Sequence, residues 1–195
     1  MPDEIGKDTI KSLVEGKLPW EEVKKLLRMP HREPSRFWKM LEVMQDKVAW
    51  KEPILLPLTD HLSIVRSKDG GRVVKCSCGQ EFGDYRINWK FSCDMYVRNT
   101  EEAFKEVYTI DPCPIETDLV EIREYYCPAC STLLAVENVP PGYPPLFDML
   151  PDLDTLYRDW LGRPLPDESP DWFQDRTPEL LAKWSAENPI ASRRS

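Results

Sequence analysis

Apolar residues recur at helical spacing through the first 50 residues of the chain. From Asp8 to about Val48 they repeat every three or four positions, in three separate stretches. Pro19, Pro30 and Pro34 fall between the stretches, where a helix can begin or must end. We therefore predict an N-terminal helical segment over residues 1–50, whose three helices pack their apolar faces together as a small bundle. Docking of these faces onto a partner is the alternative.

The pattern changes to that of strands after Pro53. Residues 62–65 and 72–75 flank the turn signal Asp69-Gly70-Gly71 and predict a β-hairpin. Residues 122–126 and 132–136 predict a second hairpin. Between them, Thr100 is a helix N-cap residue followed by two glutamates, which predicts a short helix. We expect a β domain over residues 51–138.

The last part of the chain, residues 139–195, is rich in proline and begins with Pro140-Pro141-Gly142-Tyr143-Pro144-Pro145. Such a segment cannot join the interior of a sheet and should be extended. Two short helices are expected, near residues 153–161 and 178–186. Trp160, Trp172 and Trp184 lie here, and aromatic anchors of this kind are enriched at protein interfaces. We expect an extended arm that binds a large partner, the alternative being that it folds back onto the domain.

Two close pairs of cysteines lie at the ends of the predicted hairpins. They occur as Cys76-Ser77-Cys78-Gly79 and Cys127-Pro128-Ala129-Cys130. Paired thiolates on two turns can enclose a tetrahedral zinc ion, and Gly79 tolerates the backbone angles that such a turn demands. The pattern therefore predicts a structural zinc site with the ligands Cys76, Cys78, Cys127 and Cys130.

The spacing leaves other uses of the thiols open. The first pair is CxC, and 48 residues separate Cys78 from Cys127, so some of the four can be buried thiols instead. A redox dithiol or a catalytic zinc fits less well, because the chain lacks a βαβ context around the second pair and its two histidines, His31 and His61, are remote from both pairs. Cys93 or Cys113 could replace one of the four proposed ligands if the fold brings it near.

Charge and composition narrow the class of protein. The 195 residues carry a net charge of −8 with 19 prolines, and no long basic run is present, which argues against binding to nucleic acid. No apolar run approaches the roughly 20 residues that span a bilayer, and the N-terminus lacks the features of a signal peptide. We expect a cytoplasmic protein that does not bind membranes. In the reducing cytoplasm, cysteines stay as thiols and are better suited to metal binding than to disulfides.

The motifs of common catalytic sites are absent from the sequence. It contains no phosphate-binding loop, dinucleotide fingerprint, nucleophile elbow or HExxH helix. A binding or structural subunit is therefore favoured, and a small zinc enzyme with unseen ligands is the alternative. We predict an α+β fold, with zinc-ribbon-like β-hairpins pinned by one zinc, an N-terminal helical segment and extended Pro-rich C-terminal arms.

Several ordered motifs also carry a family resemblance. They are Leu13-Val14-Glu15-Gly16-Lys17, Trp50 with Ile54-Leu55-Leu56-Pro57-Leu58, the first cysteine pair with Phe82, Asn88-Trp89-Lys90, Val97-Arg98-Asn99-Thr100, Ile122-Arg123-Glu124-Tyr125-Tyr126 before the second pair, Tyr143-Pro144 and Trp160-Leu161-Gly162. On these motifs the chain resembles the small gamma subunit of acetone carboxylase and related ATP-dependent ketone carboxylases. It departs from the family at Ser131, where such subunits tend to have glycine, and in a longer tail from about Asp167.

The resemblance implies a role without catalytic residues of its own. Two large, hydantoinase-like alpha and beta subunits would use ATP to phosphorylate bicarbonate and the enolised ketone and join them into a β-keto acid, with manganese also in a large subunit. The small chain would bind zinc and clamp the large chains, in a hetero-oligomer with two copies of each subunit. Pockets of the large subunits would choose among acetone, butanone and acetophenone. The alternative is a stand-alone zinc-ribbon module that binds other proteins.

Overall fold

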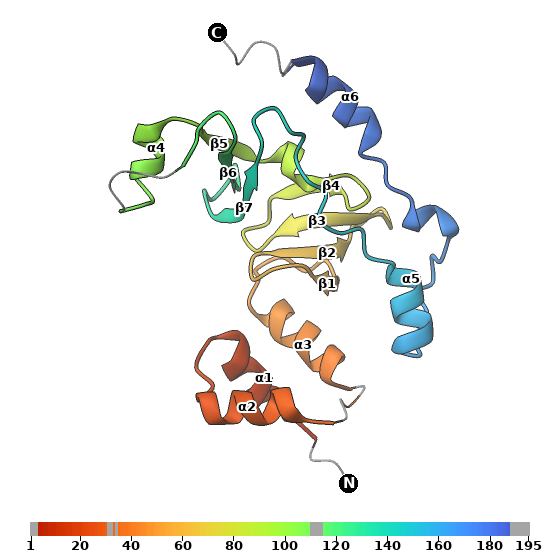
Figure 1. The fold of residues 1–195 in the computed structure, drawn as a ribbon. Helices are drawn as coiled ribbons and strands as arrows, with labels where there is room; N and C mark the ends of the chain where they lie inside the picture. The colour runs from red at the N-terminus through yellow and green to blue at the C-terminus, as the bar shows by residue number, and fades with distance from the viewer. Residues whose placement is uncertain (1–3, 31–32, 34, 110–114, 188–195) are drawn as a thin grey trace.

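The computed structural model describes residues 4–30, 33, 35–109 and 115–187. Three helices open the chain, as predicted: α1 (Lys7–Val14), α2 (Trp20–Arg28) and α3 (Ser35–Asp46). Ile10 of α1 packs with Val43 of α3 in a small apolar cluster, and Met44 on α3 packs against the first sheet. The N-terminal helices thus form one end of the molecule (Figure 1).

The first sheet has four antiparallel strands in the order β1-β2-β3-β4. These strands are β1 (Ile54–Pro57), β2 (Leu62–Arg66), β3 (Arg72–Cys76) and β4 (Glu81–Asp84). The register from Leu62↔Cys76 to Arg66↔Arg72 confirms the hairpin predicted around Asp69-Gly70-Gly71. Its second strand delivers Cys76 to the edge of the sheet.

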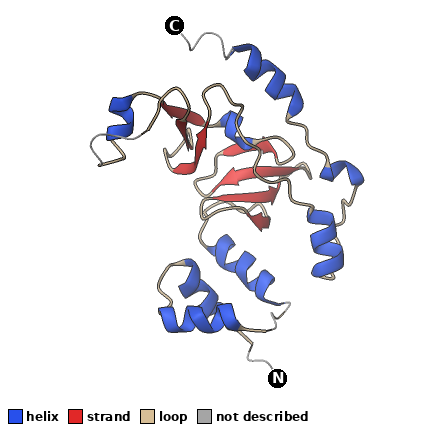
Figure 2. Cartoon of the chain, viewed as in Figure 1, coloured by secondary structure: helices blue, strands red, loops and turns tan. Residues whose placement is uncertain are grey.

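The second sheet has three antiparallel strands in the order β5-β6-β7, and both sheets are drawn in red in Figure 2. Its strands are β5 (Asp94–Arg98), β6 (Glu121–Tyr126) and β7 (Leu133–Val139). The pair β6 and β7 is the second predicted hairpin. The two predicted hairpins therefore lie in separate sheets, because β4 occupies the open edge of β3 and β5 occupies that of β6.

Short elements link and follow these sheets. A 3₁₀ turn covers Trp89–Ser92, and the short helix α4 (Glu101–Lys105) follows β5. The Thr100 side chain accepts a hydrogen bond from the Ala103 backbone N–H, so Thr100 is the N-cap expected from the sequence. The predicted helix at 153–161 is present as α5 (Leu153–Thr155) continued by a π turn (Leu156–Trp160), and α6 (Pro178–Glu187) is the last helix.

One apolar core connects both sheets with the C-terminal segment. It includes Leu62 and Ile64 of β2, Leu134 of β7, and Leu153 and Tyr157 from the α5 region. Cys76 and Cys127 are also members, so one cysteine of each pair is fixed within the core. Burial of this apolar surface is the main force that holds the two sheets in place.

The C-terminal segment lies along one side of the sheets (Figure 1). The Tyr157 hydroxyl donates to the Leu55 carbonyl, and Tyr85 donates to the Trp172 carbonyl. Trp172 packs on the chain itself, whereas Trp160 is 79% exposed. Within the described residues, much of the Pro-rich segment is thus fixed on its own sheets, and Trp160 is the tryptophan that the fold leaves most open.

No described helix is both long and apolar enough to cross a lipid bilayer.

Candidate metal centre

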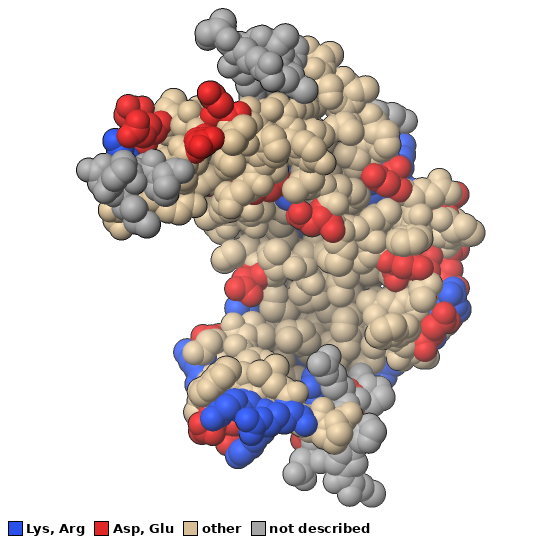
Figure 3. Space-filling model, viewed as in Figure 1, with Lys and Arg blue, Asp and Glu red and all other residues tan. Residues whose placement is uncertain are grey.

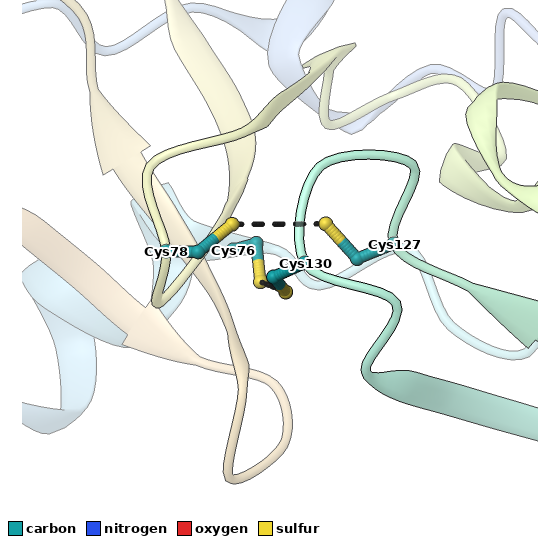
Figure 4. Close-up of side chains that lie close together, drawn as sticks. All are labelled: Cys76, Cys78, Cys127 and Cys130. Atoms are coloured by element: carbon teal, nitrogen blue, oxygen red, sulfur yellow. Dashed lines mark hydrogen bonds between the residues drawn. The ribbon is translucent and has the colours of Figure 1, made fainter.

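The two cysteine pairs come together where the turn after β3 faces the turn between β6 and β7 (Figure 4). The sulfur atoms of Cys76, Cys78, Cys127 and Cys130 all lie within 4.8 Å of one another. All four residues predicted from the sequence are therefore in one group, although the pairs are far apart in the chain.

The sulfur spacing fits a zinc ion. A Zn–S bond of about 2.3 Å in a regular tetrahedron places neighbouring sulfurs about 3.8 Å apart. Cys76 Sγ lies 3.9 Å from Cys130 Sγ, and Cys78 Sγ lies 3.7 Å from Cys127 Sγ. These distances are far longer than the roughly 2.05 Å of a disulfide bond. A closed set of four thiolates is typical of structural zinc and leaves no open position for a substrate.

The first turn is fixed by its own backbone. The Gly79 N–H donates to the Cys76 carbonyl at 2.9 Å, and the Cys76 N–H donates to the Gln80 carbonyl at 2.8 Å. Gly79 has φ +105°, a conformation that residues with a β-carbon rarely adopt, and a β-carbon there would lie 3.6 Å from the Trp50 ring. The glycine is thus needed for the backbone angle of this turn.

The second turn repeats the arrangement with a different residue. The Ser131 N–H donates to the Cys127 carbonyl at 2.8 Å, and the Cys127 N–H donates to the Thr132 carbonyl at 2.9 Å. Ser131 has φ +56°, the left-handed conformation that favours glycine. Glycine, the residue expected here from the family resemblance, would adopt this backbone angle at less cost.

Trp50 supports the first turn from outside. Its indole Nε1–H is shared between the carbonyls of Cys76 at 3.1 Å and Ser77 at 3.2 Å. The Lys75 ammonium lies 5.2 Å from the centre of the same ring, on which it can make a cation–π contact. Sequence reasoning missed this role of Trp50, since no local pattern connects it to a turn 26 positions away.

The four thiols differ in their surroundings. Cys76 and Cys127 are buried, whereas Cys78 and Cys130 are exposed. Burial raises the pKa of the Cys76 thiol to about 12, and hydrogen bonding with the Thr132 side chain and backbone lowers the pKa of Cys130 to about 6. A bound cation favours the thiolate form of every ligand. The centre thus has a dry inner side and a solvent-facing outer side.

The remaining candidates lie apart from the group. Cys93 packs against the core with its Sγ 3.8 Å from the Trp89 carbonyl, and burial raises its pKa to about 12. Among the described residues, the four cysteines form the group that could hold a metal ion. Neither Cys93 nor His61 belongs to this group. His31 and Cys113 lie outside the described residues.

The fold and the cysteine group together define the class of protein: a small α+β protein with four clustered cysteines at the junction of two antiparallel sheets. Residues 48–161 match the family model described as "Acetone carboxylase gamma subunit". The chain is 38% identical over 161 residues to the acetone carboxylase gamma subunit of Xanthobacter autotrophicus. The aligned region covers 82% of this chain and 95% of that protein. The chain therefore belongs to the acetone carboxylase gamma subunit family.

A second relative is more distant. The acetophenone carboxylase beta subunit of Aromatoleum aromaticum is 31% identical over 83 residues, which make up 40% of this chain and 62% of that protein. Both relatives are named as subunits of carboxylases.

Proposed function

We propose that this chain is the small, zinc-binding structural subunit of a multi-subunit ATP-dependent ketone carboxylase. The complete enzyme would join bicarbonate to acetone or a similar ketone to give a β-keto acid. The single observation that carries the proposal is the 38% identity to an acetone carboxylase gamma subunit along almost the whole of that relative.

The chain's own contribution would be structural. The four thiolates would hold one zinc ion and lock the turn after β3 to the turn after β6. A structural site of this kind contributes to folding and supplies no reactive ligand position. Several buried carboxylates are already engaged: Glu137 pairs with Lys90, Asp154 with Arg72 and Glu124 with Arg98. We assign no catalytic residue to this chain.

The chemistry would belong to two large hydantoinase-like alpha and beta subunits, with ATP and possibly manganese bound there. Two copies of each subunit would form the complex. We propose a cytoplasmic location, because free thiols suit a reducing compartment. Exposed large side chains such as Trp160 and Phe173 are suited to contacts with these partners.

The test is a single purification of the complex from the native host through a tag on this chain, followed by metal analysis. We expect two large subunits in equal amounts with this chain, ATP- and bicarbonate-dependent consumption of a ketone, and one zinc per small chain. A well-behaved monomer that binds zinc but no large subunits would contradict the proposal and favour a stand-alone zinc-ribbon module.

A further inference from the structure

One edge of the second sheet is open. β5 is an outer strand, and its inner edge pairs with β6 in continuous register from Asp94↔Tyr126 to Arg98↔Ile122. Among the described residues, no main-chain hydrogen bond joins its outer edge to another element. An outer strand of this kind presents a row of N–H and C=O groups that can pair with another strand.

β5 lacks some of the features by which proteins protect such an edge, and its charged residues Asp94 and Arg98 stand at its two ends. Its sequence, Asp94-Met95-Tyr96-Val97-Arg98, contains no proline or lysine, and its register with β6 has no bulge. Met95 is 38% exposed and Tyr96 is 45% exposed. Because neighbouring residues of a strand point to opposite faces, β5 is accessible from both sides of the sheet.

The open edge continues into an exposed face of mixed apolar and charged side chains, on which the Arg98 guanidinium lies 4.8 Å from the centre of the Tyr96 ring. Tyr96 and Val136 both register with Glu124, so all three side chains lie on one face of the sheet. Val136 is 53% exposed, and Leu133 on the same strand β7 is also exposed. A strand added beside β5 would extend this face and cover Tyr96.

Charge argues for the kind of strand that fits. The Arg98 guanidinium holds α4 against the end of β5 through the Ala103 carbonyl at 3.1 Å and the Glu106 carboxylate. Glu101, Glu102 and Glu106 are exposed there, of which Glu101 pairs with Lys105 at 2.6 Å, and Figure 3 shows acidic side chains gathered over the α4 end of the molecule. Two copies of this chain paired antiparallel through β5 would place Asp94 of one copy beside the α4 acids of the other, whereas a basic partner would be attracted.

We propose that an extended segment of a large partner subunit, apolar at its centre and carrying Lys or Arg, adds as a fourth strand to β5. This inference rests on the proposed function, which supplies the large subunits. Main-chain hydrogen bonds to the outer edge of β5 give the affinity, and contacts with Met95, Tyr96 and the α4 carboxylates give the specificity.

The test uses the full chain and the large subunits purified from the native complex. Met95→Lys places a cation on the edge, where it opposes both strand addition and a basic partner. We expect at least a tenfold rise in the Kd for the large subunits. The matched control is Leu27→Lys on α2, a residue that is 69% exposed at the other end of the molecule (Figure 1) and that should leave the Kd unchanged. Unchanged zinc content and circular dichroism show that each variant is folded.

Two further measurements report on the strand itself. Hydrogen exchange of the backbone amides in residues 94–98 should slow in the complex relative to the isolated chain. The double variant Glu101→Lys/Glu102→Lys should weaken assembly and make it less sensitive to salt, because the attraction between unlike charges is removed.

The outcomes separate the inference from the proposed function. If the wild-type chain does not assemble with the large subunits, both fail. If it assembles and Met95→Lys assembles equally well, or if the amides of β5 exchange at the same rate in the complex, only the inference is overturned. A homodimer of the isolated chain that Met95→Lys converts to a monomer would assign the edge to a second copy and overturn it as well.

Discussion

The guanidinium of Arg72 on β3 donates a hydrogen bond to the carboxylate of Asp154, 82 positions further along the chain. The Arg72 side chain is completely buried, and its Nε–H also donates to Asp167 at 3.1 Å. A buried charge without its partner is strongly destabilising. These contacts fix the C-terminal segment onto the first sheet.

Replacing Asp154 with alanine should therefore destabilise the protein. We expect the free energy of unfolding to fall by about 2–3 kcal/mol, since Arg72 keeps Asp167 as a partner. Urea denaturation measures the change. The control Asp159→Ala removes an exposed carboxylate paired with Arg158, and its effect should be below about 1 kcal/mol. Equal effects of the two variants would contradict a special role for the buried pair.

Asp167 should make stability depend on pH. Burial disfavours its charged form, but hydrogen bonds from Arg66 and Arg72 outweigh burial and hold the pKa of Asp167 below its ordinary value of 3.8. A lowered pKa in the folded state stabilises the protein above the unfolded-state pKa, and this stabilisation is lost as the pH falls through the folded-state pKa. Between about pH 5 and pH 2, wild type should lose more stability than Asp167→Asn. Parallel losses would show that this carboxylate is not the group involved.

Removing a single thiolate should release the metal. We expect Cys127→Ser to lose most of its bound zinc and to unfold at a lower temperature, because Cys127 is a proposed ligand in the four-cysteine group and also part of the core. Cys93→Ser is the matched control, since this cysteine lies outside the group, and it should retain one zinc per chain. Metal analysis and thermal unfolding of the purified variants give the answer, and zinc retained by Cys127→Ser would contradict the assignment.

Trp50 should act on the centre through the first turn. Trp50→Phe keeps a ring but removes the indole N–H shared by the Cys76 and Ser77 carbonyls, which should cost about 1–2 kcal/mol. Zinc transfer to a chelator should also be faster, because the turn is held less firmly. Trp160→Phe, at an exposed position, should change neither quantity. An unchanged transfer rate in Trp50→Phe would remove Trp50 from the support of the site.

Ser131 offers a stabilising change. Since its φ of +56° is unfavourable for any residue with a β-carbon, Ser131→Gly should raise the free energy of unfolding by about 0.5–1 kcal/mol. The same replacement within helix α1, Ser12→Gly, should lower it by roughly 0.5–1 kcal/mol, because glycine weakens helix interiors. Thermal unfolding of the two zinc-loaded variants compares them directly, and a loss of stability in Ser131→Gly would show that its side chain makes a compensating contact.

The elements with strong local signals could be predicted from the sequence. The turn signal at Asp69-Gly70-Gly71 predicted one hairpin, the N-cap at Thr100 predicted α4, and the spacing of the cysteine pairs predicted the four thiols that the fold brings together. Each signal lies within a few residues, so no knowledge of distant contacts was needed.

The features that were missed depend on distant contacts. β4 is four residues long and contains Gly83 at φ +89°, which weakens any strand pattern. The position of the C-terminal segment depends on pairs such as Arg72 with Asp167, 95 positions apart. Composition predicted an extended Pro-rich segment, and the ion pairs that hold this part of the chain against the first sheet have no signature along the sequence.

The separation of the two cysteine turns has a consequence for how the chain reaches its native state. Cys78 and Cys127 stand 49 positions apart, so closing the loop between them carries an entropy cost of about 3.5 kcal/mol beyond a constant. Zinc coordination by four thiolates supplies roughly 10–16 kcal/mol, which exceeds that cost several times over. Each sheet can nucleate locally, and a bound ion would then fasten the union that the shared apolar core begins. If the centre holds zinc, we expect the supply of this metal during synthesis to influence how much of the chain matures before proteases remove the rest.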